Sequence, residues 1–140
     1  MADFVLDASL TLAWCFEDER TGFSDAMLSR LEAGESAMTP ALWGLEVGNG
    51  IRSAVKRGRI AAADVGEQLR FLRYLPVRMV DQSRRTMLEE ITPLALEHDL
   101  SAYDAAYFHL ARQHDLPLAT LDGLLRRAAE KADWPVIAPQ

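Results

Sequence analysis

Short apolar segments alternate with longer amphipathic ones along the whole chain, and this alternation limits the possible folds more than any other sequence feature. The expected strands are residues 4–6, 37–38, 77–80, 118–121 and 136–137. The expected helices are residues 10–16, 22–31, 39–57, 62–75, 83–97, 101–114 and 123–131. Because right-handed crossovers join such strands, the pattern predicts an α/β fold with a mainly parallel sheet and helices on both faces.

Capping residues set several of these boundaries. Thr39 and Pro40 combine a hydroxyl cap with proline at the first helical position, which predicts a helix start. Ser101 is the expected cap of the next-to-last helix, and Gly34 the expected stop of the second. Pro93 should kink the helix that contains it. No repeat, linker or low-complexity tract divides the chain, so we expect a single domain over residues 1–140.

The composition excludes several classes of protein. Hydrophobic residues make up 49% of the chain and charged residues 26%, as in a globular protein. The net charge of −6 argues against binding nucleic acid through a broad positive field, unless metal ions supply local charge. Cys15 is alone, and His109 and His114 are too widely spaced for one helix face, so no zinc site is expected. No membrane span or leader is visible, and we expect a cytoplasmic protein.

Acidic residues stand where the expected strands end. Asp7 and Asp122 follow the first and fourth strands, and Asp104 lies in the first turn of a crossover helix. In parallel sheets, ligands lie beyond the carboxyl ends of the strands, so these acids should share one edge. Each acid also has a structural explanation. Asp7 and Asp122 can cap helices, and Ser101 and Asp104 have capping-box spacing.

Glu46 is too far inside its helix to act as a cap. It shares a stripe with Leu42 and Leu45 that continues through Asn49 and Ser53, which predicts partial burial. An unpaired buried carboxylate is costly and usually pairs, protonates or binds a metal. The alternative is a salt bridge to a basic residue such as Arg52. Three glycines of this helix suggest close packing against another backbone: Gly44, Gly48 and Gly50.

Together the acids predict a metal site. Four carboxylates in one cleft repel each other, and no basic residue adjoins Asp7, Asp104 or Asp122 in sequence. Magnesium prefers a few carboxylates and retains waters for a phosphate substrate, which suits phosphodiester hydrolysis. Three polar residues close to the acids in sequence are candidates for orienting them by hydrogen bonds: Ser9, Asn49 and Thr120. The alternative is that these side chains only make hydrogen bonds at the ends of helices or strands.

Four segments carry a resemblance that spans nearly the whole chain. FVLDAS (4–9), PALWGLEVGNGI (40–51), LSAYDAAYFHLA (100–111) and LATLD (118–122) together resemble a PIN-domain ribonuclease, and most of all the VapC-type toxins of type II toxin–antitoxin systems. The resemblance implies a three-layer α/β/α domain with sheet order 3-2-1-4-5 and an endoribonuclease dependent on Mg²⁺ or Mn²⁺. It assigns catalysis and metal binding to Asp7, Glu46, Asp104 and Asp122. It also implies a homodimer and a VapB-type antitoxin partner whose tail fills the cleft.

Arginines partly answer the charge objection. The guanidinium group of arginine suits phosphate because it can donate two hydrogen bonds at once, although a solvated helix face explains each basic residue alone. Basic residues cluster at one helix end and form two further pairs: Arg52, Lys56, Arg57 and Arg59, then Arg84 with Arg85, and Arg126 with Arg127. The apolar residues of 10–16 and 71–74 are expected in the core. A minority of them could line a dimer face or an antitoxin groove.

Two other functions compete with a nuclease. In an aspartyl-phosphate enzyme Asp7 would be the nucleophile, but Ser9 stands where the phosphatase pattern has a second Asp. Neither Lys56 nor Lys131 follows an expected strand, as both such families require. The second alternative is a catalytically idle PIN-like scaffold that binds RNA or protein. A scaffold has no need of four mutually repelling acids.

Overall fold

The five strands form one parallel sheet at the centre of the molecule. The computed structural model describes residues 1–140 and orders the strands β3-β2-β1-β4-β5, with every neighbouring pair parallel. The strands are β1 (Phe4–Leu6), β2 (Ala37–Pro40), β3 (Val77–Val80), β4 (Leu118–Ala119) and β5 (Val136–Ile137). The expected fold class and strand order are therefore confirmed.

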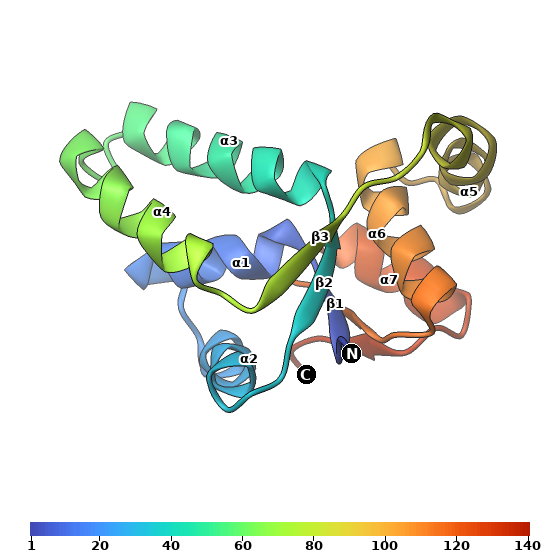
Figure 1. Ribbon diagram of the computed structural model, residues 1–140, viewed down its shortest axis with the longest axis horizontal. Helices are drawn as coiled ribbons and strands as arrows, with labels where there is room; N and C mark the ends of the chain where they lie inside the picture. Colours follow the sequence, from blue (N-terminus) through green and yellow to red (C-terminus); the bar gives the residue numbers. More distant parts are fainter.

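Helices cover both faces of this sheet. They are α1 (Ala8–Cys15), α2 (Gly22–Glu32), α3 (Leu42–Lys56), α4 (Val65–Arg73), α5 (Thr92–His98), α6 (Ala102–His114) and α7 (Gly123–Lys131), with short turns η1 (Glu17–Glu19), η2 (Ala62–Asp64) and η3 (Thr86–Ile91). In Figure 1, α1 to α4 lie on one side of the strands and α5 to α7 on the other, which gives three layers. No helix is both long and apolar enough to cross a lipid bilayer.

Two clusters of buried side chains hold the layers together. Alternate residues of a strand point to opposite faces, so Val5 belongs to the cluster that contains α6 and α7 residues, whereas Phe4 and Leu6 belong to the cluster beneath α1 and α2. Leu118 and Ala119 of β4 divide between the two clusters in the same way. The three central strands β2, β1 and β4 are fully buried, as expected for a parallel sheet covered on both faces, whereas the edge strands β3 and β5 are partly exposed.

The helix start expected at Thr39-Pro40 is wrong. β2 continues to Pro40, which pairs with Val80 of β3, and the N–H of Ala41 donates to the carbonyl of Val80 at 3.1 Å. α3 begins only at Leu42, without a side-chain cap. The sequence signal is local, whereas β2 lies between two partner strands whose ladder extends over these residues.

The fourth strand is also shorter than expected. It ends at Ala119, because the N–H of Leu121 donates to the Ser9 hydroxyl at 3.0 Å instead of to a backbone carbonyl. The region before Pro93 is a π-helix over Thr86–Ile91, where a kink was expected. Proline withholds an N–H from the preceding turn, and the Thr92 hydroxyl donates there to the carbonyl of Met87 at 2.9 Å. The Ser101 cap is present, since its hydroxyl accepts from the Asp104 N–H at 3.0 Å.

Candidate active site

Four carboxylates from distant parts of the chain line one cavity of about 340 Å³. Asp7 directly precedes α1, Asp122 precedes α7, Glu46 lies in α3 and Asp104 in the first turn of α6. β1 and β4 are neighbours in the sheet, which brings the first two acids to the same edge. The remaining lining residues include no lysine, arginine or histidine: Ala8, Ser9, Leu12, Asn49 and Gly50. The cavity therefore gathers negative charge without a cationic partner.

Asp7 is the most deeply buried of the four, with 4% of its surface exposed. Its Oδ2 accepts a hydrogen bond from the Ser9 hydroxyl at 2.6 Å and another from the Thr120 hydroxyl at 2.7 Å. It makes no side-chain cap bond to α1, so the capping explanation fails for this residue. Burial raises the pKa of Asp7, the two hydroxyls act in the opposite direction, and the charge of Asp122 raises it further.

Asp122 combines both expected roles. Its Oδ1 accepts from the N–H groups of Leu124 and Leu125 at 2.9 and 3.0 Å, so it does cap α7. Its backbone N–H donates to the Thr120 hydroxyl at 2.9 Å, the same hydroxyl that donates to Asp7. Thr120 therefore fixes the spacing between the two acids at the ends of β1 and β4.

Glu46 is half-buried, but its surroundings differ from the expectation. Tyr107 donates its hydroxyl to Oε1 of Glu46 at 2.6 Å. No ion pair joins Glu46 to Arg52, and Asn49 lines the cavity without a hydrogen bond to Glu46. Burial raises the pKa of Glu46, the Tyr107 hydroxyl lowers it, and the charges of Asp7 and Asp122 raise it again.

The expected stripe on α3 is partly wrong. Leu45 is 81% exposed, and the buried positions of this helix are Trp43, Val47, Ile51 and Ala54. Glu46 lies at the edge of that buried face because it follows the buried Trp43 by three residues. The face is set by how α3 packs against α1 and the sheet, which the sequence pattern alone did not reveal.

The expected close backbone packing at three glycines is also wrong. A Cβ at Gly48 would meet nothing within 4 Å, and one at Gly44 would make ordinary contact with Met79 at 3.5 Å. Only Gly50 is tight, since a Cβ there would lie 2.6 Å from Cδ1 of Leu12. The neighbour is a side chain of α1, so this glycine allows α1 and α3 to pack closely.

Asp104 is partly buried at the mouth of the cavity. Burial raises its pKa to about 6, and the charges of Asp122, Asp7 and Glu46 add to this effect in that order. Ser101 accepts from the Asp104 N–H as the helix cap, and its hydroxyl also acts to lower the pKa of the Asp104 carboxyl. The four carboxylates thus act on one another electrostatically, as the sequence argument required.

Sequence reasoning missed two groups that support the site. The first is Tyr107, whose position three residues after Asp104 places a hydroxyl on the same helix face. The second group is the buried pair of Trp43 and Thr11, in which the Trp43 Nε1 donates to the Thr11 hydroxyl of α1 at 2.9 Å. A buried tryptophan needs an acceptor, but nothing in the sequence identifies which one.

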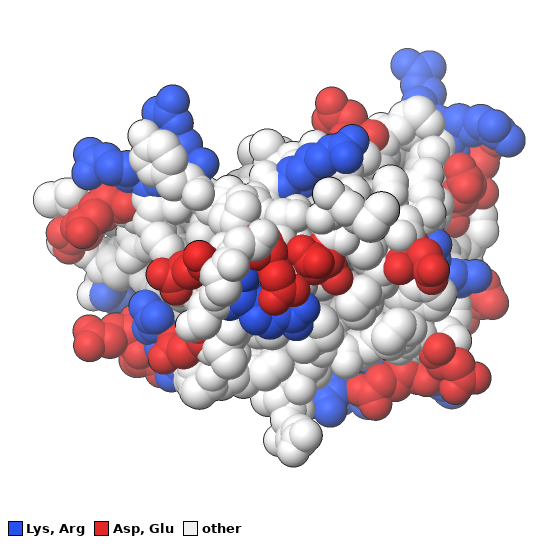
Figure 2. All heavy atoms as spheres, turned by 60° about the horizontal axis from the view of Figure 1, so that its bottom comes forward, with Lys and Arg blue, Asp and Glu red and all other residues white.

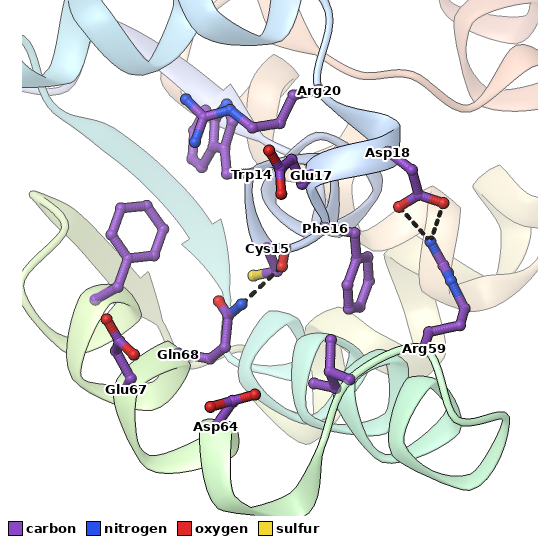
Figure 3. Close-up of a pocket in the computed structure, with 12 residues that line it drawn as sticks. Trp14, Cys15, Phe16, Glu17, Asp18, Arg20, Arg59, Asp64, Glu67 and Gln68 are labelled. Atoms are coloured by element: carbon purple, nitrogen blue, oxygen red, sulfur yellow. Dashed lines mark hydrogen bonds and ion pairs between the residues drawn. The ribbon is translucent and has the colours of Figure 1, made fainter.

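A second and larger cavity, of about 860 Å³, lies at the other end of α1, between η1 and α4 (Figure 3). Trp14, Phe16 and Phe71 contribute aromatic walls, and Gln68 donates to the carbonyl of Cys15 at 2.7 Å. Burial raises the pKa of the Cys15 thiol to about 11, so this lone cysteine stays protonated.

Two arginines line the larger cavity, Arg20 and Arg59, whereas none lines the acidic one. Arg59 pairs with Asp18 at 3.0 Å and with Glu19 at 2.7 Å, and its guanidinium lies 4.6 Å from the centre of the Phe16 ring. Arg20 pairs with Asp25, which lies outside the lining, at 2.9 Å. Charges are also mixed elsewhere on the surface. Figure 2 brings forward the side where both termini lie, and there acidic and basic side chains are interspersed without a broad basic field.

The donor chemistry of the acidic cavity fits a hard divalent cation. All its candidate donors are oxygen atoms, which Mg²⁺ and Mn²⁺ prefer. Burial raises the pKa of the Asp7 carboxyl, so a nearby positive charge would stabilise its ionised form. As the side chains stand, no three His, Cys, Asp or Glu residues are grouped closely enough to hold an ion. The fit therefore rests on the donors and their shared cavity.

Comparisons with known proteins agree with this geometry. The family model described as PIN domain matches residues 4–131. Ribonuclease VapC3 from Pyrobaculum aerophilum is 30% identical over 127 residues, which cover 91% of this chain and 92% of that protein.

Two solved structures share the fold. PAE2754 from Pyrobaculum aerophilum has a TM-score of 0.73 at 22% identity, covering 98% of this chain and 89% of that one. A toxin–antitoxin complex from Klebsiella pneumoniae has a TM-score of 0.57 at 18% identity, covering 86% and 87%. Sequence match, fold and the clustered acids lead to one conclusion: the chain belongs to the PIN-domain family.

Proposed function

We propose that this protein is a metal-dependent endoribonuclease that hydrolyses RNA phosphodiester bonds and acts as the toxin of a type II toxin–antitoxin pair. The name of its relative, Ribonuclease VapC3, supports the reaction class. The observation that carries the proposal is the cavity in which four carboxylates meet without a lysine or arginine. A scaffold would gain nothing from such a cluster, because like charges brought together destabilise the fold.

Asp7, Glu46, Asp104 and Asp122 are the residues that would hold Mg²⁺ or Mn²⁺. A bound divalent ion lowers the pKa of its water and stabilises charge on a phosphodiester. The chain contributes pre-organisation: Ser9 and Thr120 orient Asp7, and the α7 N–H groups orient Asp122. Asp104, with a pKa of about 6, is mostly ionised at neutral pH and available as a ligand.

Several basic residues remain free to contact RNA phosphates. Arg59, Arg85 and Arg126 are engaged in ion pairs with Asp or Glu. The other basic residues identified in the sequence make no ion pair: Arg52, Lys56, Arg57, Arg84 and Arg127. Guanidinium groups bind phosphate by paired hydrogen bonds, so these are the candidates for holding the substrate.

A VapB-type antitoxin is the proposed protein partner, and a homodimer the proposed assembly. The solved Klebsiella pneumoniae structure is described as a toxin–antitoxin complex, and one of its chains shares the fold of this protein. An antitoxin tail that carries arginine or lysine would compensate the charge of the acidic cavity and block it.

The alternative is an idle PIN-like scaffold that binds RNA or protein without cutting it. The observation in its favour is that the carboxylates do not yet surround a common point. The two functions differ in their response to metal. The scaffold should bind RNA equally well in a chelator and in Mn²⁺, and it should leave the RNA intact.

The test is cleavage of total RNA by purified protein with Mg²⁺, with Mn²⁺ and with a chelator. We expect cleavage only with metal, and a metal-dependent rise in the melting temperature that Asp7→Asn and Asp104→Asn lose. Heat-treated protein and both variants control for contaminating ribonuclease. Intact RNA in every condition, together with unchanged melting temperatures, would leave the scaffold as the better explanation.

A further inference from the structure

Tyr107 joins the protein core to the acidic cavity. Its side chain is fully buried among residues of the largest core cluster, and its hydroxyl donates to Oε1 of Glu46 at 2.6 Å. That short bond runs between α6 and α3, two helices that are far apart in sequence. The phenol ring is held by packing, so the position of its hydroxyl is fixed as well.

Glu46 has no other restraint. The bond from Tyr107 is its only hydrogen bond, and it forms no ion pair. Glutamate is a long side chain with considerable rotamer freedom, and Glu46 is only half-buried. Without the hydroxyl, its carboxylate could turn outward to solvent and away from the other acids.

We infer that Tyr107 is a positioning residue that holds the Glu46 carboxylate in the acidic cavity, with Oε1 bound and Oε2 left for a divalent cation. Asp104 lies three residues before Tyr107 on α6, so one rigid helix contributes one acid directly and restrains a second through the tyrosine. This inference rests on the proposed metal-dependent function. It adds a residue that lines no part of the cavity itself.

The experiment compares Tyr107→Phe with a matched control, Tyr103→Phe. Both substitutions remove one phenol hydroxyl from α6, but Tyr103 is 64% exposed and its hydroxyl makes no hydrogen bond. Mn²⁺ affinity is measured by titration calorimetry without RNA, below the melting temperature of every variant. We expect Tyr107→Phe to bind Mn²⁺ roughly 10- to 100-fold more weakly, as for other residues that orient metal ligands, and Tyr103→Phe to match wild type.

A double-mutant cycle shows whether the effect passes through Glu46. Once Glu46→Gln has removed the carboxylate charge, adding Tyr107→Phe should cause no further loss of Mn²⁺ affinity. In cleavage assays Tyr107→Phe should lower kcat at limiting Mn²⁺ and recover toward wild type at saturating Mn²⁺, while KM for RNA stays unchanged.

The outcomes separate the inference from the proposed function. Tyr107→Phe could lower the melting temperature and still bind Mn²⁺ as tightly as wild type. That result would show that Tyr107 only packs in the core, and it would overturn this inference but not the proposed function. An equal loss of affinity in the Glu46→Gln background would also overturn it. A wild-type protein that neither binds Mn²⁺ nor cleaves RNA would overturn the proposed function and the inference together.

Discussion

The two ends of α1 each face a cavity, and the cavities differ in how their charges are compensated. At the amino end, Asp7 meets Glu46, Asp104 and Asp122 without a basic neighbour in a cavity of about 340 Å³. At the carboxyl end, a cavity of about 860 Å³ has four acidic lining residues as well, but Arg20 and Arg59 also line it, and Arg59 forms an ion pair with Asp18.

This difference shows that volume is a poor guide to the chemistry of this protein. The exposed ion pairs of the large cavity contribute little energy and call for no ligand. The uncompensated carboxylates of the small cavity raise one another's pKa values, which is typical of functional sites. Matched substitutions in the two cavities therefore test whether charge compensation, and not size, identifies the active site.

The largest expected effect is on RNA cleavage. Asp104→Asn should lower metal-dependent cleavage by about a hundredfold or more, since a metal ion contributes several kcal/mol to transition-state stabilisation. Asp64→Asn is the same change on the wall of the large cavity and should leave the rate unchanged. Initial rates on one RNA substrate measure both. Similar losses in the two variants would remove the distinction between the cavities.

The next effect is on stability. Thr120→Val removes the hydroxyl that donates to Asp7 and accepts from the Asp122 N–H, so the Asp122 N–H loses its acceptor and the buried Asp7 Oδ2 keeps only the bond from Ser9. We expect the free energy of unfolding to fall by about 1–3 kcal/mol. Urea unfolding measures it, with Gln68→Leu as the comparison, because that change removes one partly buried bond to the Cys15 carbonyl in the large cavity. A larger loss in Gln68→Leu would contradict the greater importance of the acidic cavity.

The third effect depends on pH. Folding raises the pKa of Asp104 to about 6, so the folded state binds its proton more tightly than the unfolded state does. The stabilisation is complete below the ordinary carboxyl pKa and is lost as pH rises through about 6. In a chelator, the melting temperature of wild type should therefore fall by a few degrees over this range relative to Asp104→Asn.

Millimolar Mn²⁺ should oppose that fall, because metal binds the ionised carboxylates. Calorimetric melts across the pH range, with and without metal, provide the measurement. Parallel curves for wild type and Asp104→Asn in the chelator would mean that the acids do not interact as the structure indicates.

The smallest effect is expected in the large cavity. Arg59→Gln breaks the pairs with Asp18 and Glu19, whose side chains are 75% and 43% exposed. Exposed pairs are screened by salt, so the melting temperature should differ from wild type only slightly at low salt and not at all in high salt. A large loss that persists in high salt would show that the contact of the guanidinium with the Phe16 ring matters more than its charge.

Several parts of the fold could be predicted from the sequence because their signals are local. The apolar segment Phe4–Leu6 and the cap at Ser101 depend on residues next to each other, and both are present. Thr39-Pro40 gave an equally clear local signal and was misleading, since pairing with β3 extends the strand over it. Local signals fail where a partner from elsewhere competes for the same backbone.

The candidate site, too, could be predicted from the sequence only in part. The positions of Asp7 and Asp122 after their strands follow from the chain order, because parallel strands place their ends at one edge. The surroundings of Glu46 do not follow, since Leu45 is exposed and Tyr107 takes the place expected for Asn49. Which face of a helix is buried depends on the neighbours that pack against it.

The sequence by itself determined the α/β class, the order of the strands along the chain and the four acids that line one cavity. Only the tertiary structure decided which hydroxyl restrains each acid and which cavity keeps its charge uncompensated. The physical reason is the separation along the chain of the residues that interact. Strand and cap signals depend on a few neighbouring residues. A hydrogen bond such as that from Tyr107 to Glu46 joins residues 61 positions apart and exists only once the helices have packed.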